Sequence, residues 1–209
     1  VLKAREMLDE LREVEAIIHA AQEPLSGPLR LGLIATVGPY LMPHILPALK
    51  QQYPKLELVL HEGLTEDLLA SVKSGTLDLI IAAAPLQSSG IKQELLYHEP
   101  FLLAAPKDHE IATKGQIKSS DLRGDEMVLL EEGHCLSGQA LDVCPSKRRH
   151  NRKRLHAMSL ETLRHMVASG AGYTLLPYLA VGKRPALSKM IKYKACLLYT
   201  SDAADEVVR

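Results

Sequence analysis

The stretch from Leu29 to Ile81 decides the fold, and it reads LRLGLIATVGPYLMPHILPALKQQYPKLELVLHEGLTEDLLASVKSGTLDLII. Three short apolar runs lie in it, at 29–34, 56–60 and 77–81, and two segments with helical spacing separate them. Short apolar runs bounded by turn residues predict strands. Strands that alternate with helices predict a parallel sheet with right-handed crossovers. The stretch therefore predicts an α/β fold.

A second α/β unit follows an extended crossover at residues 95–105. It contains a predicted strand at 125–130, a helix at 160–168 with Ser159 as its N-cap, and a strand at 173–177. Two lobes with a cleft between them are expected, with ligands at the carboxyl ends of the strands. Thr36 follows the first strand, and Thr65 is expected to cap a helix. Both are candidates for the cleft wall, although each is also explained as a simple helix-entry hydroxyl.

Residues 1–22 have the spacing of one helix. Its apolar positions repeat in a 4-3-4-3 pattern, which is typical of a coiled-coil seam: Met7, Leu11, Val14, Ile18 and Ala21. A linker or dimerisation helix is predicted, and an amphipathic helix packed on the domain is the alternative. We expect this helix at 1–26, a first regulatory lobe at 27–98 and a second lobe at 99–195.

The composition limits the possible functions. The chain has 209 residues, with 25 Lys and Arg against 25 Asp and Glu, so its net charge is zero. A chain that binds nucleic acid by itself usually has a basic excess, so any DNA contact is expected outside these residues. No apolar run reaches the roughly 18 residues of a membrane helix, and the charged start does not resemble a signal peptide. A cytoplasmic protein without membrane contact is expected.

Several longer stretches carry a resemblance to a known family. LMPHILPALKQQYP from Leu41 and LLASVKSGTLDL from Leu68 resemble the first lobe of LysR-type transcription regulators. TVGPYLMPHI from Thr36, LLEEGHCLSGQALDVC from Leu129 and SLETLRHMVASGAGYTLLP from Ser159 resemble the OxyR group, the peroxide-responsive members of that family. The resemblance covers about residues 1–182. It implies a two-lobed domain like periplasmic binding proteins, preceded by a linker helix, with a winged helix-turn-helix domain outside this chain.

The resemblance also implies a redox site. Cys135 corresponds to the peroxidatic cysteine and Cys144 to its resolving partner, while Thr36, Thr65 and His134 correspond to positions around the peroxide. Hydrogen peroxide would oxidise Cys135 to a sulfenic acid, Cys144 would resolve it as a disulfide, and the parent protein would switch oxidative-stress genes. A homodimer or tetramer, DNA contact through the missing domain, and a thiol reductant such as glutaredoxin or thioredoxin are implied. No cofactor and no metal are expected.

The spacing of the two cysteines has a physical consequence. They lie nine positions apart, which along a helix is roughly 13 Å at about 1.5 Å per residue. Disulfide-bonded Cα atoms lie within about 7 Å of each other. If a helix occupies the intervening residues, it has to unwind before the bond forms.

Three segments depart from the family pattern. Residues 145–154 read PSKRRHNRKR, a basic run that a solvated loop explains and that nucleic-acid binding would also explain. Leu155 and Met158 stand where the group usually has a phenylalanine and a threonine. The tail at 196–209 contains CLLYTSDAADE, which reads like a translated sequencing adapter. We expect this tail to be non-native, Cys196 to have no role, and the C-terminal return to the first lobe to be missing.

Other function classes stay open from sequence alone. A generic LysR effector-binding domain would bind a small organic acid with both cysteines incidental, and a periplasmic solute-binding protein is more distant. A cysteine hydrolase would use His134 and Cys135, but no third orienting group is evident, so we expect no enzyme. A zinc site would use Cys135, Cys144, His134 and His150, although their spacing matches no common zinc pattern.

Overall fold

The computed structural model describes residues 25–86, 88–144, 155–182 and 189–195, the single residues Lys3 and Leu187, and the backbone of 204–208. Three segments discussed above lie outside the described residues. They are the rest of the predicted helix at 1–22, the basic run at 145–154 and Cys196.

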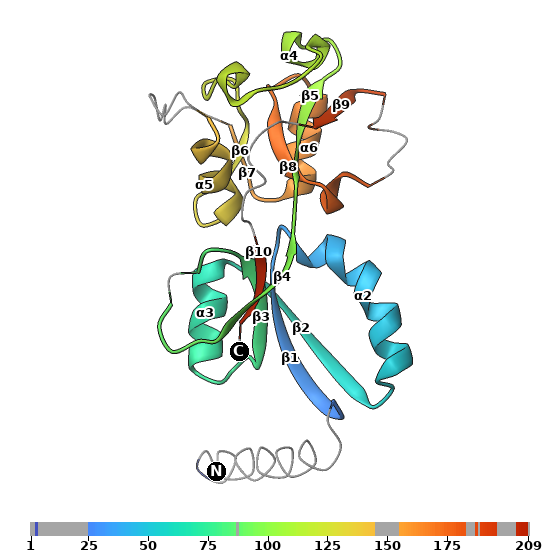
Figure 1. Cartoon of the computed structure of the whole chain (residues 1–209), viewed down its shortest axis with the longest axis vertical. Helices are drawn as coiled ribbons and strands as arrows, with labels where there is room; N and C mark the ends of the chain where they lie inside the picture. The colour runs from blue at the N-terminus through green and yellow to red at the C-terminus, as the bar shows by residue number, and fades with distance from the viewer. Residues whose placement is uncertain are drawn as a thin grey trace.

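The first lobe is built on a five-stranded sheet, which lies in the lower half of Figure 1. Its strand order is β2-β1-β3-β10-β4. β1 runs parallel to both β2 and β3, as the alternating pattern predicts. Helices α2 and α3 are the crossovers and flank the sheet in this view. The bounds are β1 (Gly27–Ile34), α2 (Gly38–Gln52), β2 (Leu56–Gly63), α3 (Thr65–Lys73), β3 (Leu79–Ala83), β4 (Gln93–His98) and β10 (Ala204–Val208).

The sequence of this lobe explains its close packing. Residues of β3 are almost all buried, which suits a strand covered on both faces. Gly32 in β1 lies so close to its neighbours that a Cβ atom there would meet side-chain atoms of Leu77, Ile80 and Leu68 at 2.7–2.9 Å. Only glycine therefore allows α3 to pack this closely over β1 and β3.

The first lobe has a returning strand, contrary to the expectation from sequence. Residues 204–208 form β10, which pairs antiparallel with both β3 and β4. The position between β3 and β4 offers backbone donors and acceptors on both sides. A ladder needs only backbone N–H and C=O groups, so a segment without family resemblance can fill it.

The second lobe contains a three-stranded antiparallel sheet in the order β8-β5-β9, and a short parallel pair, β6-β7. The strand predicted at 125–130 is only two residues long, with a separate bridge from Met127 to Tyr173. α6 matches its prediction, and Ser159 caps it by accepting a hydrogen bond from the Thr162 N–H at 3.2 Å. The bounds are β5 (Phe101–Pro106), α4 (Glu110–Thr113), the 3-10 turn η1 (Ser119–Asp121), β6 (Leu129–Leu130), α5 (Cys135–Asp142), β7 (His156–Ala157), α6 (Leu160–Ala168), β8 (Thr174–Pro177), the 3-10 turn η2 (Leu179–Val181) and β9 (Ile191–Ala195).

The two lobes are in contact, because side chains of each lobe pack against the core of the other. Cys135 and Leu179 of the second lobe pack against the core of the first. Tyr40 of α2 packs against the core of the second lobe, and its hydroxyl donates to Glu161 Oε1 at 3.0 Å. A change at any of these contacts therefore affects how the lobes fit together. Within the described part of the chain, no helix has the length and apolar character that crossing a bilayer requires.

Candidate redox site between the lobes

Cys135 is the first residue of α5. The chain before it turns at Gly133, whose φ of +101° favours glycine, and His134 is the extended N-cap residue. The Ser137 hydroxyl donates to the Leu130 carbonyl at 2.7 Å and fastens the first turn of α5 to β6. A helix N-terminus carries a partial positive charge from its N–H groups. Cys135 therefore lies at the positive end of the α5 dipole.

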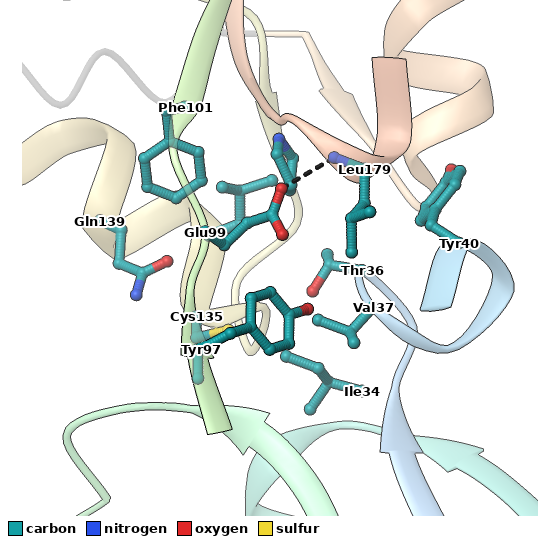
Figure 2. A pocket seen from close by; sticks show the side chains of 13 residues that line it. Ile34, Thr36, Val37, Tyr40, Tyr97, Glu99, Phe101, Cys135, Gln139 and Leu179 are labelled. Atoms are coloured by element: carbon teal, nitrogen blue, oxygen red, sulfur yellow. Dashed lines mark hydrogen bonds between the residues drawn. The ribbon is translucent and has the colours of Figure 1, made fainter. Parts of the chain in front are cut away.

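Cys135 lies on the wall of a small cavity between the lobes. The cavity has a volume of about 20 Å³, room for about one or two water-sized molecules. Figure 2 shows the polar side chains of Thr36, Tyr97, Glu99 and Gln139 around it, together with the Cys135 sulfur. The other lining residues are apolar: Ile34, Val37, Ala83, Phe101, Leu136, Pro177 and Leu179, with Tyr40 at one side.

The neighbouring strand and helix explain why two residues, Thr36 and Gln139, line this cavity. Thr36 comes shortly after β1, is 5% exposed and lines the cavity. Gln139 is four residues after Cys135 in α5, so the two side chains lie on the same side of the helix. Gln139 has no signal of its own in the sequence, because the local pattern does not decide whether a helix follows Cys135.

Glu99 is a buried acid at the connection between the lobes. It is 7% exposed, and its Oε1 accepts a hydrogen bond from the Leu179 N–H at 2.8 Å (Figure 2). Burial raises the pKa of Glu99 above its ordinary value, although hydrogen bonds from the Leu179 and Tyr178 backbone and from Tyr97 act in the opposite direction. Glu99 thus ties the β4–β5 connection to η2. Its signal in the sequence is the single acid within the mostly apolar crossover at 95–105.

Cys135 also borders a second, larger and more open groove, with a volume of about 520 Å³. Thr65 and His134 line this groove and not the small cavity, so the structure does not gather Thr36, Thr65 and His134 in one pocket. Thr65 is the first residue of α3 rather than its cap, because Leu64 occupies the N-cap position. Its hydroxyl oxygen is buried and has no hydrogen-bond partner among the described residues.

Cys144 lies beyond the other end of α5 in a different environment. It is 1% exposed, packs in the second-lobe core near Met127 and Tyr173, and donates from Sγ to the Leu122 carbonyl at 3.2 Å. No disulfide joins it to Cys135. Since α5 occupies seven of the eight intervening positions, the two Cα atoms are roughly 13 Å apart along the helix. The two sulfurs therefore cannot meet while α5 is intact.

The structure gives no support to the zinc site considered from sequence. Within the described ranges no group of three His, Cys, Asp or Glu side chains could hold a metal ion, and His150 lies outside them. Leu155 and Met158, the departures from the family pattern, are exposed and line neither the cavity nor the groove.

The LysR substrate binding domain matches residues 22–192. The chain belongs to this family of LysR domains. The two-lobed α/β fold expected from sequence is that of this LysR domain.

Similar proteins narrow the comparison within the LysR family. The DNA-binding transcriptional dual regulator OxyR of Escherichia coli K12 is 46% identical over 179 residues, which cover 86% of this chain and 59% of that protein. The chain thus spans less than two thirds of that relative. The crystal structure of the reduced form of OxyR matches with a TM-score of 0.75, and that of the oxidized form with 0.71. Each is 42% identical and covers 89% of this chain and 86% of that one. The resemblance to the OxyR group is confirmed.

Proposed function

We propose that this LysR-type domain senses hydrogen peroxide for a DNA-binding transcription regulator, and that Cys135 and Cys144 are its redox pair. One observation carries the proposal: the Cys135 thiol, at the N-terminus of α5, lies on a cavity of about 20 Å³ beside the Thr36 hydroxyl. Hydrogen peroxide has only two heavy atoms and suits this volume. An organic acid is too large for it, which disfavours the alternative of a metabolite-sensing domain for this cavity.

The first step is oxidation of Cys135. Its thiolate attacks one peroxide oxygen, so that an S–O bond forms and the O–O bond breaks. The departing hydroxide takes a proton and leaves as water, and Cys135 becomes a sulfenic acid. The Thr36 hydroxyl and the Gln139 amide line the same cavity and are positioned to hold the peroxide by hydrogen bonds.

The second step is attack by Cys144 on the sulfenic sulfur, which forms the disulfide and releases the oxygen as water. Cys144 has to leave the Leu122 carbonyl and the second-lobe core, and α5 has to unwind. Closing so short a loop restricts the chain by about 2.5 kcal/mol on the chain-entropy estimate, which is comparable to allosteric couplings of about 1–3 kcal/mol. Because Cys135 packs on the first lobe, its departure changes the fit between the lobes.

The remaining parts of the proposal concern the whole protein. The similar E. coli protein is named a DNA-binding transcriptional regulator, so we assign DNA binding to a domain outside this chain. A cytoplasmic homodimer or tetramer, control of oxidative-stress genes, and reduction by glutaredoxin or thioredoxin complete the proposed cycle. The domain reacts stoichiometrically with peroxide and is not proposed to be an enzyme.

Thr36→Val tests the role of the small cavity. Valine keeps the shape of threonine but removes the hydroxyl, so oxidation of Cys135 by hydrogen peroxide should slow about tenfold, equivalent to one lost hydrogen bond of about 1.4 kcal/mol in the transition state. Thr36→Ser is the matched control and should stay near the wild-type rate. Sulfenic acid formation is measured in a Cys144→Ser background, where the second step is absent. Equal rates for the valine and serine variants would contradict the proposed peroxide site.

A further inference from the structure

We propose that Tyr173 retains Cys144 in the reduced fold and thereby slows the formation of its disulfide with the oxidised Cys135. Tyr173 acts through the peptide group that accepts the Cys144 thiol, so it is a positioning residue and not a reacting one. The effect on the disulfide rests on the proposed function, whereas the retention of Cys144 in the reduced chain does not.

One peptide group connects the two side chains. Its carbonyl, on Leu122, accepts the hydrogen bond from Cys144 Sγ at 3.2 Å. Its N–H, on Arg123, donates to Tyr173 Oη at 2.5 Å. The C=O and N–H of a planar trans peptide group point in opposite directions, so an acceptor that fixes the N–H also fixes the carbonyl. The Tyr173 hydroxyl therefore fixes the direction in which the Leu122 carbonyl faces Cys144.

Tyr173 is itself firmly held. It is 0% exposed, and its hydroxyl also donates to the Arg123 carbonyl at 3.0 Å, so it contacts two successive peptide groups. Its backbone N–H donates to the Glu126 carbonyl at 3.1 Å, and its own carbonyl accepts from the Val128 N–H at 2.9 Å. Burial raises the pKa of the Tyr173 hydroxyl, which therefore remains protonated and donates at neutral pH.

The contact at Cys144 affects α5 because this helix is short. A helix of eight residues is marginal by itself in water, so contacts with the rest of the lobe keep it folded. Cys144 directly follows Val143, the C-cap residue of α5, and packs in one core cluster with Leu122 and Tyr173. Release of the thiol frees this end of the helix. Retention of Cys144 therefore opposes the unwinding that the disulfide requires.

The delayed step is the closing of the disulfide. The released Cys144 thiol loses its proton and attacks the sulfur of the Cys135 sulfenic acid. The S–S bond forms, the S–O bond breaks, and the hydroxide leaves with the proton as water. Until then, a second peroxide can oxidise the sulfenic acid to a sulfinic acid. Retention of Cys144 thus lengthens the lifetime of the sulfenic acid.

Tyr173→Phe tests the retention in the reduced chain. Phenylalanine keeps the ring and its edge-on contact with His109 but removes the hydroxyl. In a Cys135→Ser background without peroxide, alkylation of Cys144 by iodoacetamide is measured peptide by peptide, so that Cys196 is counted separately. A buried thiol reacts only after local opening. We expect alkylation about tenfold faster in Tyr173→Phe, equivalent to about 1.4 kcal/mol and one lost hydrogen bond.

Ile191→Val is the matched control. Ile191 is 2% exposed and packs in the other core cluster of the second lobe, which contains neither Tyr173 nor Cys144. The lost methylene lowers stability without touching the shared peptide group. Cys144 alkylation should stay within about twofold of the parent. Urea unfolding of both variants shows how much of each rate follows from general destabilisation.

The second measurement follows the disulfide in the chain with both cysteines. A short pulse of hydrogen peroxide is stopped with catalase, and the conversion of the Cys135 sulfenic acid to the disulfide is followed over time. Tyr173→Phe should close the disulfide about tenfold faster. Since Tyr173 does not line the small cavity, oxidation of Cys135 should change less than about twofold. Ile191→Val should change neither rate.

The outcomes separate retention from the proposed function. If Cys144 is alkylated no faster in Tyr173→Phe than in Ile191→Val, the hydroxyl does not retain the thiol and the assignment is wrong. Faster alkylation with unchanged closing of the disulfide also overturns the assignment, because retention then does not limit the reaction. If peroxide does not oxidise Cys135, the proposed function fails, and the alkylation rates alone decide whether Tyr173 retains Cys144.

Discussion

Cys135→Ser is expected to abolish the oxidation of this chain by low concentrations of hydrogen peroxide. A serine hydroxyl does not reduce peroxide, and the other cysteine of the proposed pair cannot take over. Cys144 is 1% exposed and lines neither the cavity nor the groove. The measurement is the number of thiols lost and of peroxide molecules consumed per chain after brief treatment.

Cys144→Ser is the matched control for that experiment. Because Cys135 and its cavity are unchanged, this variant should consume one peroxide per chain and accumulate a sulfenic acid that dimedone traps at Cys135. The assignment of Cys135 as the reacting residue would be contradicted if Cys135→Ser lost thiols as fast as the wild type. Oxidation that starts at Cys144 in the wild-type chain would contradict it equally.

Glu161→Ala is expected to destabilise the chain by about 2 kcal/mol. Arg164 is 0% exposed, and its Nη1 donates to Glu161 Oε1 at 3.2 Å, while its Nη2 donates to the Ala180 carbonyl. Without the carboxylate, a buried cation is left without its ion-pair partner, which costs about 3–5 kcal/mol for fully buried pairs. Glu161 itself is 41% exposed, so water screens part of this interaction and we expect the lower figure. Urea unfolding of the purified variant measures it.

The double variant Glu161→Ala/Arg164→Met separates the buried charge from the contact across the lobes. Methionine fills much of the arginine volume without a charge, so most of the lost stability should return. The Tyr40 hydrogen bond to Glu161 is still missing in the double variant. A second variant, Tyr40→Phe, removes only that bond and should cost about 1 kcal/mol. A double variant no more stable than Glu161→Ala would show that the buried charge is not the cause.

The parts of the fold that sequence predicts are those set by local patterns. Apolar runs of strand length locate β1, β2 and β3, and the hydroxyl of Ser159 marks the start of α6. The strand predicted at 125–130 is largely absent, because Met127 makes only an isolated bridge to Tyr173. Partners distant in sequence set the length of that strand, and no local pattern reports them.

Some residues of the candidate site can also be predicted from local sequence, and others cannot. Thr36 follows from its place at the carboxyl end of β1, and Cys135 from the family resemblance. Gln139 and Glu99 become visible only when the start of α5 and the fit between the lobes are known. The family resemblance predicts Thr65 near Thr36, whereas Thr65 borders the groove and Thr36 the small cavity. Two residues that both border Cys135 need not border each other. Their spacing along the chain does not show whether they line the same pocket or two different ones.

Peptide mapping of the wild-type chain before and after brief treatment with hydrogen peroxide tests the redox pair most directly. In the untreated chain, Cys135 and Cys144 should both be available as free thiols after denaturation. After treatment, one cross-linked peptide should join Cys135 to Cys144, and a reductant should reverse it. Circular dichroism should show a loss of helix as α5 unwinds. Both thiols unchanged, or Cys135 oxidised further with no bond to Cys144, would contradict the account.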